Sequence, residues 1–158
     1  MTIILISLFF WFHTVDPLLD IGYEQYEKGE FTEAVKSFSR AIEVDPKNAE
    51  AHFLRAMTYQ GLALSKRAIA DLEKAIVLKI DYSEAFQQLG YIYLVSQAPA
   101  LAIEAFDKAI LITPEVAELY INRGSAQCML GNREQATRDY QKAQEMGINY
   151  AKYMNCNS

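Results

Sequence analysis

An alanine recurs every 34 residues along this 158-residue chain, and a second alanine recurs at the same interval seven residues further on. A fixed period of this length is typical of stacked supersecondary units that bury a continuous core between neighbours. A large side chain separates the two alanines in every copy. The alanines are Ala34, Ala41, Ala68, Ala75, Ala102, Ala109, Ala136 and Ala143, and the large residues are Phe38, Leu72, Phe106 and Tyr140. The spacing therefore predicts a repeat protein.

Four copies of one unit fit this period, and each copy is predicted to contain two helices. The copies span residues 15–48, 49–82, 83–116 and 117–150. The eighth position of every copy is small, which suits a close approach of two helix backbones. These small residues are Gly22, Ala56, Gly90 and Gly124. Gly29 and Gly131 stand where paired helices need a tight turn. Pro46 and Pro114 end second helices, because proline cannot continue the hydrogen-bond ladder.

The pattern resembles the tetratricopeptide repeat family, over residues 15–150. The matching residues are Ile21, Gly22, Gly29, Phe31, Ala34, Phe38, Ala41 and Pro46 in the first copy and Leu89, Gly90, Tyr93, Ala102, Phe106, Ala109 and Pro114 in the third. The resemblance implies an all-α fold, a right-handed α-solenoid of antiparallel helix pairs whose first helices line a concave groove. Ile80 and Ile148 replace the terminal proline, and Gln25 and Gln127 replace an aromatic residue. These departures bear on turn geometry and not on the fold.

The resemblance also assigns positions two, five, six, nine, twelve and thirteen of each first helix to the groove. The larger residues at these positions are Leu19, Tyr23, Tyr26, Phe53, Leu54, Met57, Tyr91, Leu94, Ile121 and Met129. An apolar and tyrosine-rich lining suits an extended apolar peptide or an amphipathic helix. The competing interpretation is that some of these side chains contact the next repeat.

Family members that bind the acidic C-termini of chaperones carry a clamp of lysine and asparagine residues in this groove. The corresponding positions here hold Leu19, Tyr23, Leu54, Glu84 and Gln88. We therefore do not expect that specificity.

Two pairs of opposite charges occur together in the second and fourth copies. Arg55 and Arg123 occupy the seventh position, and Asp71 and Asp139 follow sixteen residues later. The first and third copies have neither charge. This joint occurrence predicts an ion pair between the two helices of one repeat, partly buried and compensated. The alternative is that the arginines point into the groove and bind a carboxylate.

The composition and motifs disfavour other classes of protein. The net charge of −5, with 20 acidic and 15 basic residues, disfavours nucleic acid as a partner. No phosphate loop, metal-ligand set or catalytic spacing is present, so we expect no enzyme activity, cofactor or metal.

His52 replaces a large apolar or aromatic residue of the other copies and is interpreted as a packing residue. Cys128 is interpreted as a small apolar filler and Cys156 as a free thiol.

Both ends of the chain differ from the repeats. Residues 1–14 are apolar, and three interpretations remain open: an export signal or membrane anchor, an apolar arm inserted in a partner or bilayer, or a helix covering repeat one. Residues 151–158 form a short stub, which leaves the face carrying Tyr140 and Tyr150 partly open. Two interpretations remain open for this end, simple fraying, which is favoured, and homo-association.

The leading functional hypothesis is a protein–protein interaction scaffold or adaptor that holds a protein or peptide partner in the groove. The alternative is a structural module that self-assembles through open solenoid ends. The apolar segment 1–14 favours the cell envelope or a membrane over the cytoplasm. The sequence does not identify the partner.

Overall fold

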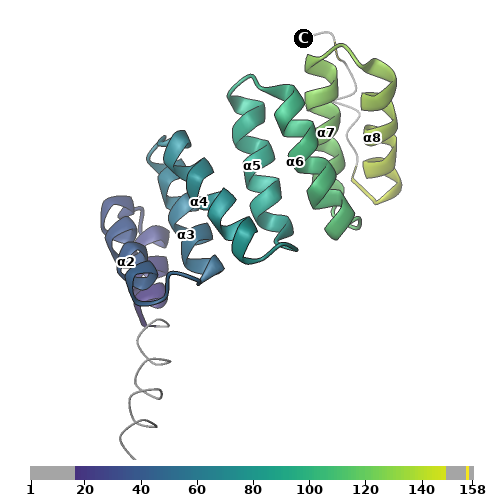
Figure 1. The fold of residues 1–158 in the computed structure, drawn as a ribbon. Coiled ribbons are helices and arrows are strands. Elements are labelled where there is room, and N and C mark those ends of the chain that lie inside the picture. Colours follow the sequence, from purple (N-terminus) through teal and green to yellow (C-terminus); the bar gives the residue numbers. More distant parts are fainter. Residues whose placement is uncertain (1–16, 149–155, 157–158) are drawn as a thin grey trace, which may run out of the picture. The chain divides into compact units, whose positions relative to one another are not determined.

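The structure is a computed structural model that describes residues 17–148 and 156. These residues are helices joined by short turns, and no strand occurs among them (Figure 1). Residues 17–27 are helical. The following helices are α2 (Phe31–Val44), α3 (Ala49–Gly61), α4 (Ser65–Leu78), α5 (Ser83–Val95), α6 (Pro99–Ile112), α7 (Ala117–Met129) and α8 (Arg133–Glu145). The all-α prediction is confirmed over the described part of the chain.

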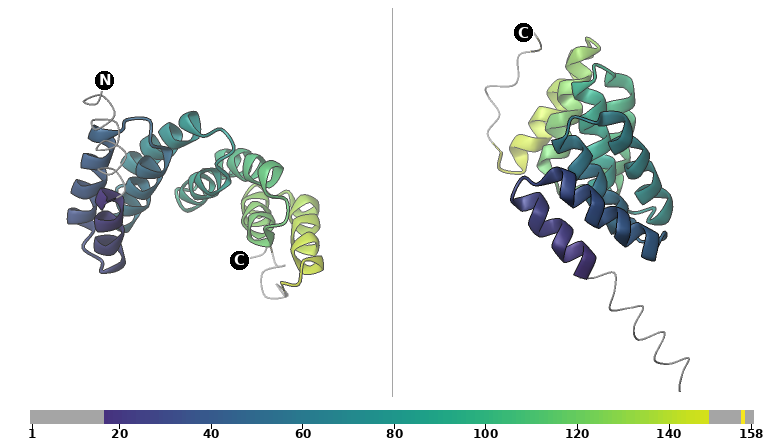
Figure 2. Two further views of the ribbon diagram at one scale, coloured as in Figure 1. Left: turned by 90° about the horizontal axis from the view of Figure 1, so that it is seen from below. Right: turned by 90° about the vertical axis from the view of Figure 1, so that its left-hand side faces the viewer.

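The helices belong to two compact units, residues 1–80 and residues 81–158. In the first unit α3 packs against both α2 and α4, and in the second unit α7 packs against α5, α6 and α8. The closest packing in the second unit joins α5 to α6 and α7 to α8. Figure 2 shows these helix pairs from two further directions. Helix pairs therefore form the structural unit in both halves.

The periodic small and large residues form the core of these pairs. All eight periodic alanines are fully buried, and so are Phe38, Leu72 and Phe106. A Cβ atom on Gly22 would lie 2.6 Å from the Phe38 ring, and one on Gly90 would lie 2.7 Å from the Phe106 ring. The glycines are therefore required by close packing. In the second copy the glycine is replaced by the larger Ala56, and the phenylalanine is replaced by the smaller Leu72.

The turn inside each helix pair has one conformation in all four copies. Gly29 and Gly131 have φ angles of 75° and 78°, as the tight-turn prediction requires. The equivalent residues Ala63 and Gln97 also have positive φ, 57° and 60°. In each turn the following residue donates its backbone N–H to the carbonyl five positions earlier, as in the bond from Glu30 to Gln25.

Ile80 and Ile148 replace the terminal proline of the second and fourth copies, and the turn differs from that of the first copy only in the fourth. Lys79, just before Ile80, is extended with φ −136°, close to the −131° of Asp45 in the first copy. After α8 the chain turns through Gly147 at φ 93°, and Ile148 donates its N–H to Ala143. The substitution at residue 80 thus preserves the turn, whereas the fourth copy uses a glycine turn.

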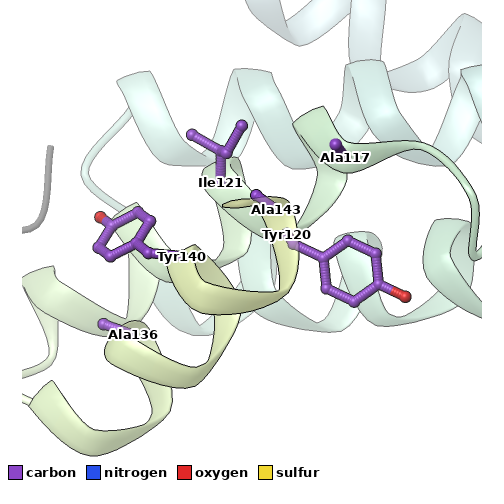
Figure 3. Close-up of a cluster of buried hydrophobic side chains, with 6 residues drawn as sticks. All are labelled: Ala117, Tyr120, Ile121, Ala136, Tyr140 and Ala143. Atoms are coloured by element: carbon purple, nitrogen blue, oxygen red, sulfur yellow. The ribbon is translucent and has the colours of Figure 1, made fainter. Parts of the chain in front are cut away.

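Both terminal segments of interest are largely outside the described residues. The interpretations of residues 1–14 therefore remain predictions, as does the assignment of Tyr150. None of the helices that the structure describes has the length and apolarity needed to cross a bilayer. The expectation of an open face at Tyr140 is wrong, because this side chain is only 3% exposed and lies in a buried cluster with Ala143 and Tyr120 (Figure 3).

Candidate partner-binding surface

In the first unit the candidate surface lies on helix 17–27 and α3. Leu19, Tyr23 and Tyr26 share one face of their helix, because they are four and three residues apart. Tyr23 is 51% exposed. Tyr26 is partly buried, with its ring 5.5 Å from that of Phe31. Leu19 packs against the buried pair of Ala41 and Ala51, so it also serves the seam between helix pairs.

The α3 residues of this surface are partly buried. They are Phe53, Leu54 and Met57, and Met57 lies beside each of the other two on the helix surface because it follows them by four and three residues. They offer apolar edges rather than whole side chains. Tyr23 is therefore the most exposed of the predicted surface residues in this unit.

In the second unit the candidate surface lies on α5 and α7, which pack together. Tyr91 is 50% exposed and Met129 is 41% exposed. Leu94 is partly buried against the cluster that contains Phe106 and Leu119. The assignment of Ile121 to the surface is wrong. Its side chain is 7% exposed and packs in the core between α7 and α8 (Figure 3).

The two ion pairs expected from the sequence are present, and both are bidentate. Arg55 Nε and Nη2 lie 2.7 and 2.8 Å from the Asp71 carboxylate oxygens. Arg123 Nε and Nη2 lie 2.9 and 2.5 Å from those of Asp139. The hydrogen bonds to Asp71 and Asp139 hold the pKa of each arginine above its usual range. The arginines therefore serve helix pairing, with their charge already compensated.

Each arginine also reaches the second helix of the preceding pair, which the sequence did not suggest. Arg55 Nη1 donates to Ser39 Oγ at 3.1 Å, and Arg123 Nη1 donates to Asp107 at 2.6 Å. Both partners precede their arginine by sixteen residues. This spacing was an available signal, because Ser39 and Asp107 are themselves 68 residues apart, which is twice the repeat period.

His52 is a packing residue, as interpreted from the sequence. It is buried, with Nδ1 3.1 Å from Asp71 Oδ1 and Nε2 3.4 Å from the Pro46 carbonyl. Tyr120 takes the same place two copies later and donates its hydroxyl to the Pro114 carbonyl at 3.0 Å. Both ring nitrogens of His52 thus contact groups of the repeat itself.

The separate roles assigned to the cysteines are wrong, because Cys128 and Cys156 form a disulfide with a Cα–Cα distance of 5.0 Å. Two cysteines in one chain can pair, but a separation of 28 residues that spans a whole helix gave no reason to expect it. Among the residues that the structure describes, no cluster of three or more potential metal ligands occurs.

Comparison with known protein families agrees with the helix pairs. A family model described as "TPR repeat" matches residues 22–62. A second model, described as "Tetratricopeptide repeat", matches residues 49–79 and 83–116. The chain belongs to the tetratricopeptide repeat family. Repeats of this family mediate interactions between proteins.

Curated relatives share about a third of the aligned residues. DnaJ homolog subfamily C member 3 of Mus musculus is 31% identical over 104 residues, which are 66% of this chain and 21% of the relative. Mitochondrial import receptor subunit TOM70 of Homo sapiens is 31% identical over 123 residues, 74% of this chain and 20% of the relative. This tetratricopeptide chain therefore spans about a fifth of the length of these relatives.

Solved structures share the tetratricopeptide solenoid fold. The crystal structure of MamA has a TM-score of 0.82 at 30% identity, and the match covers 89% of this chain and 82% of MamA. YrrB, described as a tetratricopeptide protein with an unusual peptide-binding site, has a TM-score of 0.78 at 20% identity, with 87% and 71% covered. The fold predicted from the sequence is thus confirmed.

Proposed function

We propose that this tetratricopeptide protein is an interaction scaffold that binds an apolar peptide or an amphipathic helix on the first helices of its repeats. The observation that carries the proposal is the pair Tyr23 and Tyr91. Each is half exposed, and each occupies the ninth position of its copy, one in either unit. An exposed tyrosine offers a large contact area and a hydroxyl at low entropic cost.

The surroundings of these tyrosines indicate the chemistry of the partner. Partly buried apolar side chains flank them, including Tyr26 in the first unit and Leu94 in the second. Exposed carboxylates lie on the same first helices: Asp20, Glu27, Glu50, Glu84 and Glu118. Glu24 is exposed too, but it is paired with Lys28 at 2.5 Å. An apolar surface with an acidic rim favours a partner segment that combines apolar anchors with lysine or arginine. It disfavours the acidic C-termini that a lysine-lined clamp would bind.

The test is selection of peptides from a displayed library on the full chain, followed by measurement of Kd for one selected peptide by fluorescence anisotropy. The double variant Y23A/Y91A is expected to raise Kd about tenfold or more, as loss of two aromatic anchors does at other interfaces. Leu111→Ala is the matched control, because Leu111 is 79% exposed but lies on a second helix. An unchanged Kd for the tyrosine variant would contradict the proposal.

Sedimentation velocity separates this proposal from self-assembly. A chain that remains monomeric while it binds peptide supports the scaffold function. Concentration-dependent oligomers that persist in Y23A/Y91A, together with no selected peptide, would favour the structural alternative.

A further inference from the structure

The disulfide lies at the last helix pair, where it encloses a complete helix. Cys128 is in the final turn of α7, and Cys156 follows α8. The closed loop therefore contains all of α8. Cys156 also packs against the buried cluster of α7 and α8 that includes Tyr120 and Tyr140. Both cysteine residues are partly exposed.

The position of α8 explains why such a link matters. Among the described helices α8 packs closely only against α7, whereas α6 packs against both α5 and α7. A helix with one packed neighbour buries less apolar surface than a helix with two, so a cross-link contributes more to its stability. A covalent link from α7 across α8 restricts the unfolded states of this pair, and so stabilises it.

We propose that Cys128–Cys156 is a thiol–disulfide exchange site at which a small dithiol controls the stability of the last helix pair. One thiolate of the dithiol attacks the Cys156 sulfur, the S–S bond breaks, and Cys128 leaves as a thiolate. The second thiol of the reductant then displaces Cys156 and closes its own ring. Two electrons pass to the protein, two protons complete the cysteine thiols, and the dithiol becomes a cyclic disulfide. This inference does not depend on the partner surface.

Tyr140 is placed to assist the departure of Cys128. Its hydroxyl lies 3.6 Å from Cys128 Sγ and 3.4 Å from Ser125 Oγ, and the Tyr140 residue is 3% exposed. A hydroxyl donates more strongly to a thiolate than to a disulfide sulfur, so this contact stabilises the departing Cys128 thiolate. The first and third copies have Phe38 and Phe106 at this position. The hydroxyl is therefore not needed for packing, and we assign it the role of donor to the leaving Cys128 thiolate.

The first experiment compares the full chain before and after treatment with dithiothreitol. The oxidised monomer is expected to contain no free thiol, and reduction is expected to lower Tm by about 5 °C or more. The double variant C128S/C156S should match the reduced chain and ignore dithiothreitol. Hydrogen exchange should quicken in α8 on reduction. Two free thiols after oxidation, a bond between two chains, or equal Tm values would each overturn the proposal.

The second experiment tests Tyr140 through the rate of reduction. Y140F is expected to be reduced by dithiothreitol about three- to tenfold more slowly than the natural chain, because the leaving thiolate loses a donor. Y140F placed in the C128S/C156S background should unfold at the temperature of that background, which controls for packing. Equal reduction rates would overturn the role of Tyr140.

Discussion

At the scale of single residues, two of the four turns inside the helix pairs carry a residue that does not suit the backbone conformation. Gly29, Ala63, Gln97 and Gly131 all have positive φ, yet only two of them are glycine. A side chain with a Cβ atom is strained in this region, whereas glycine is not. A Cβ added at Gly29 or Gly131 would meet no atom within 4 Å, so the local backbone is the main restriction there.

Glycine should therefore stabilise the two strained turns. We expect Ala63→Gly and Gln97→Gly each to raise the free energy of unfolding by about 0.5–1 kcal/mol, since relief of left-handed strain exceeds the added entropy of glycine. Urea denaturation followed by circular dichroism measures this change. Gly29→Ala is the reciprocal control and should destabilise by a similar amount. Lower stability of A63G and Q97G would contradict the strain argument.

At the scale of helices, the arginine of the second and fourth copies connects three elements. Arg123 on α7 binds Asp139 on α8 and Asp107 on α6, and Arg55 on α3 binds Asp71 on α4 and Ser39 on α2. Asp71 and Asp139 are buried, and the arginines are about one-fifth exposed. At the equivalent positions the third copy buries Leu89 and Ala105, whereas the first copy exposes Ile21, and Ser37 donates to Gln25 Oε1 at 2.7 Å.

The charges should therefore be replaceable as a pair and not singly. We expect Asp139→Ala to lower the free energy of unfolding by about 2 kcal/mol, because it leaves a partly buried guanidinium with only the exposed Asp107. The double variant R123L/D139A copies the third repeat and should recover at least half of this loss. Urea unfolding of the four-member mutant cycle measures the coupling. A double variant no more stable than D139A would contradict the pairing.

At the scale of the whole molecule, stability in a repeat array depends on neighbours. A helix with neighbours on both sides buries more apolar surface than a terminal helix, so opening begins at the ends. Among the described helices of the second unit, α6 packs against α5 and α7, and α8 packs against α7. Both α6 and α8 belong to the unit of residues 81–158.

We expect the amides of α8 to exchange with solvent faster than those of α6 in the oxidised chain. Hydrogen exchange followed by mass spectrometry resolves the two helices, because their peptides do not overlap. Protection of α8 equal to that of α6 would mean that the disulfide and Cys156 cap the last pair as fully as a further repeat would.

The sequence by itself determined the features that depend on residues within one repeat. The helix pairs, the buried alanines and the glycine turns at Gly29 and Gly131 follow from the 34-residue period. The Arg55–Asp71 and Arg123–Asp139 pairs follow from a spacing of sixteen residues within one copy. Because the same pattern recurs in several copies, each copy gives independent support for the same prediction. The packing role of His52 followed in the same way, from the residues at its position in other copies.

The tertiary structure alone decided which neighbour covers each surface. Ile121 occupies a position that the family assigns to the groove, but it is buried in the cluster of α7 and α8. Cys128 pairs with Cys156, a residue that follows α8 and lies outside the repeat pattern. The physical reason is that burial and disulfide pairing depend on distances between segments, whereas the repeat period specifies only the positions within one unit.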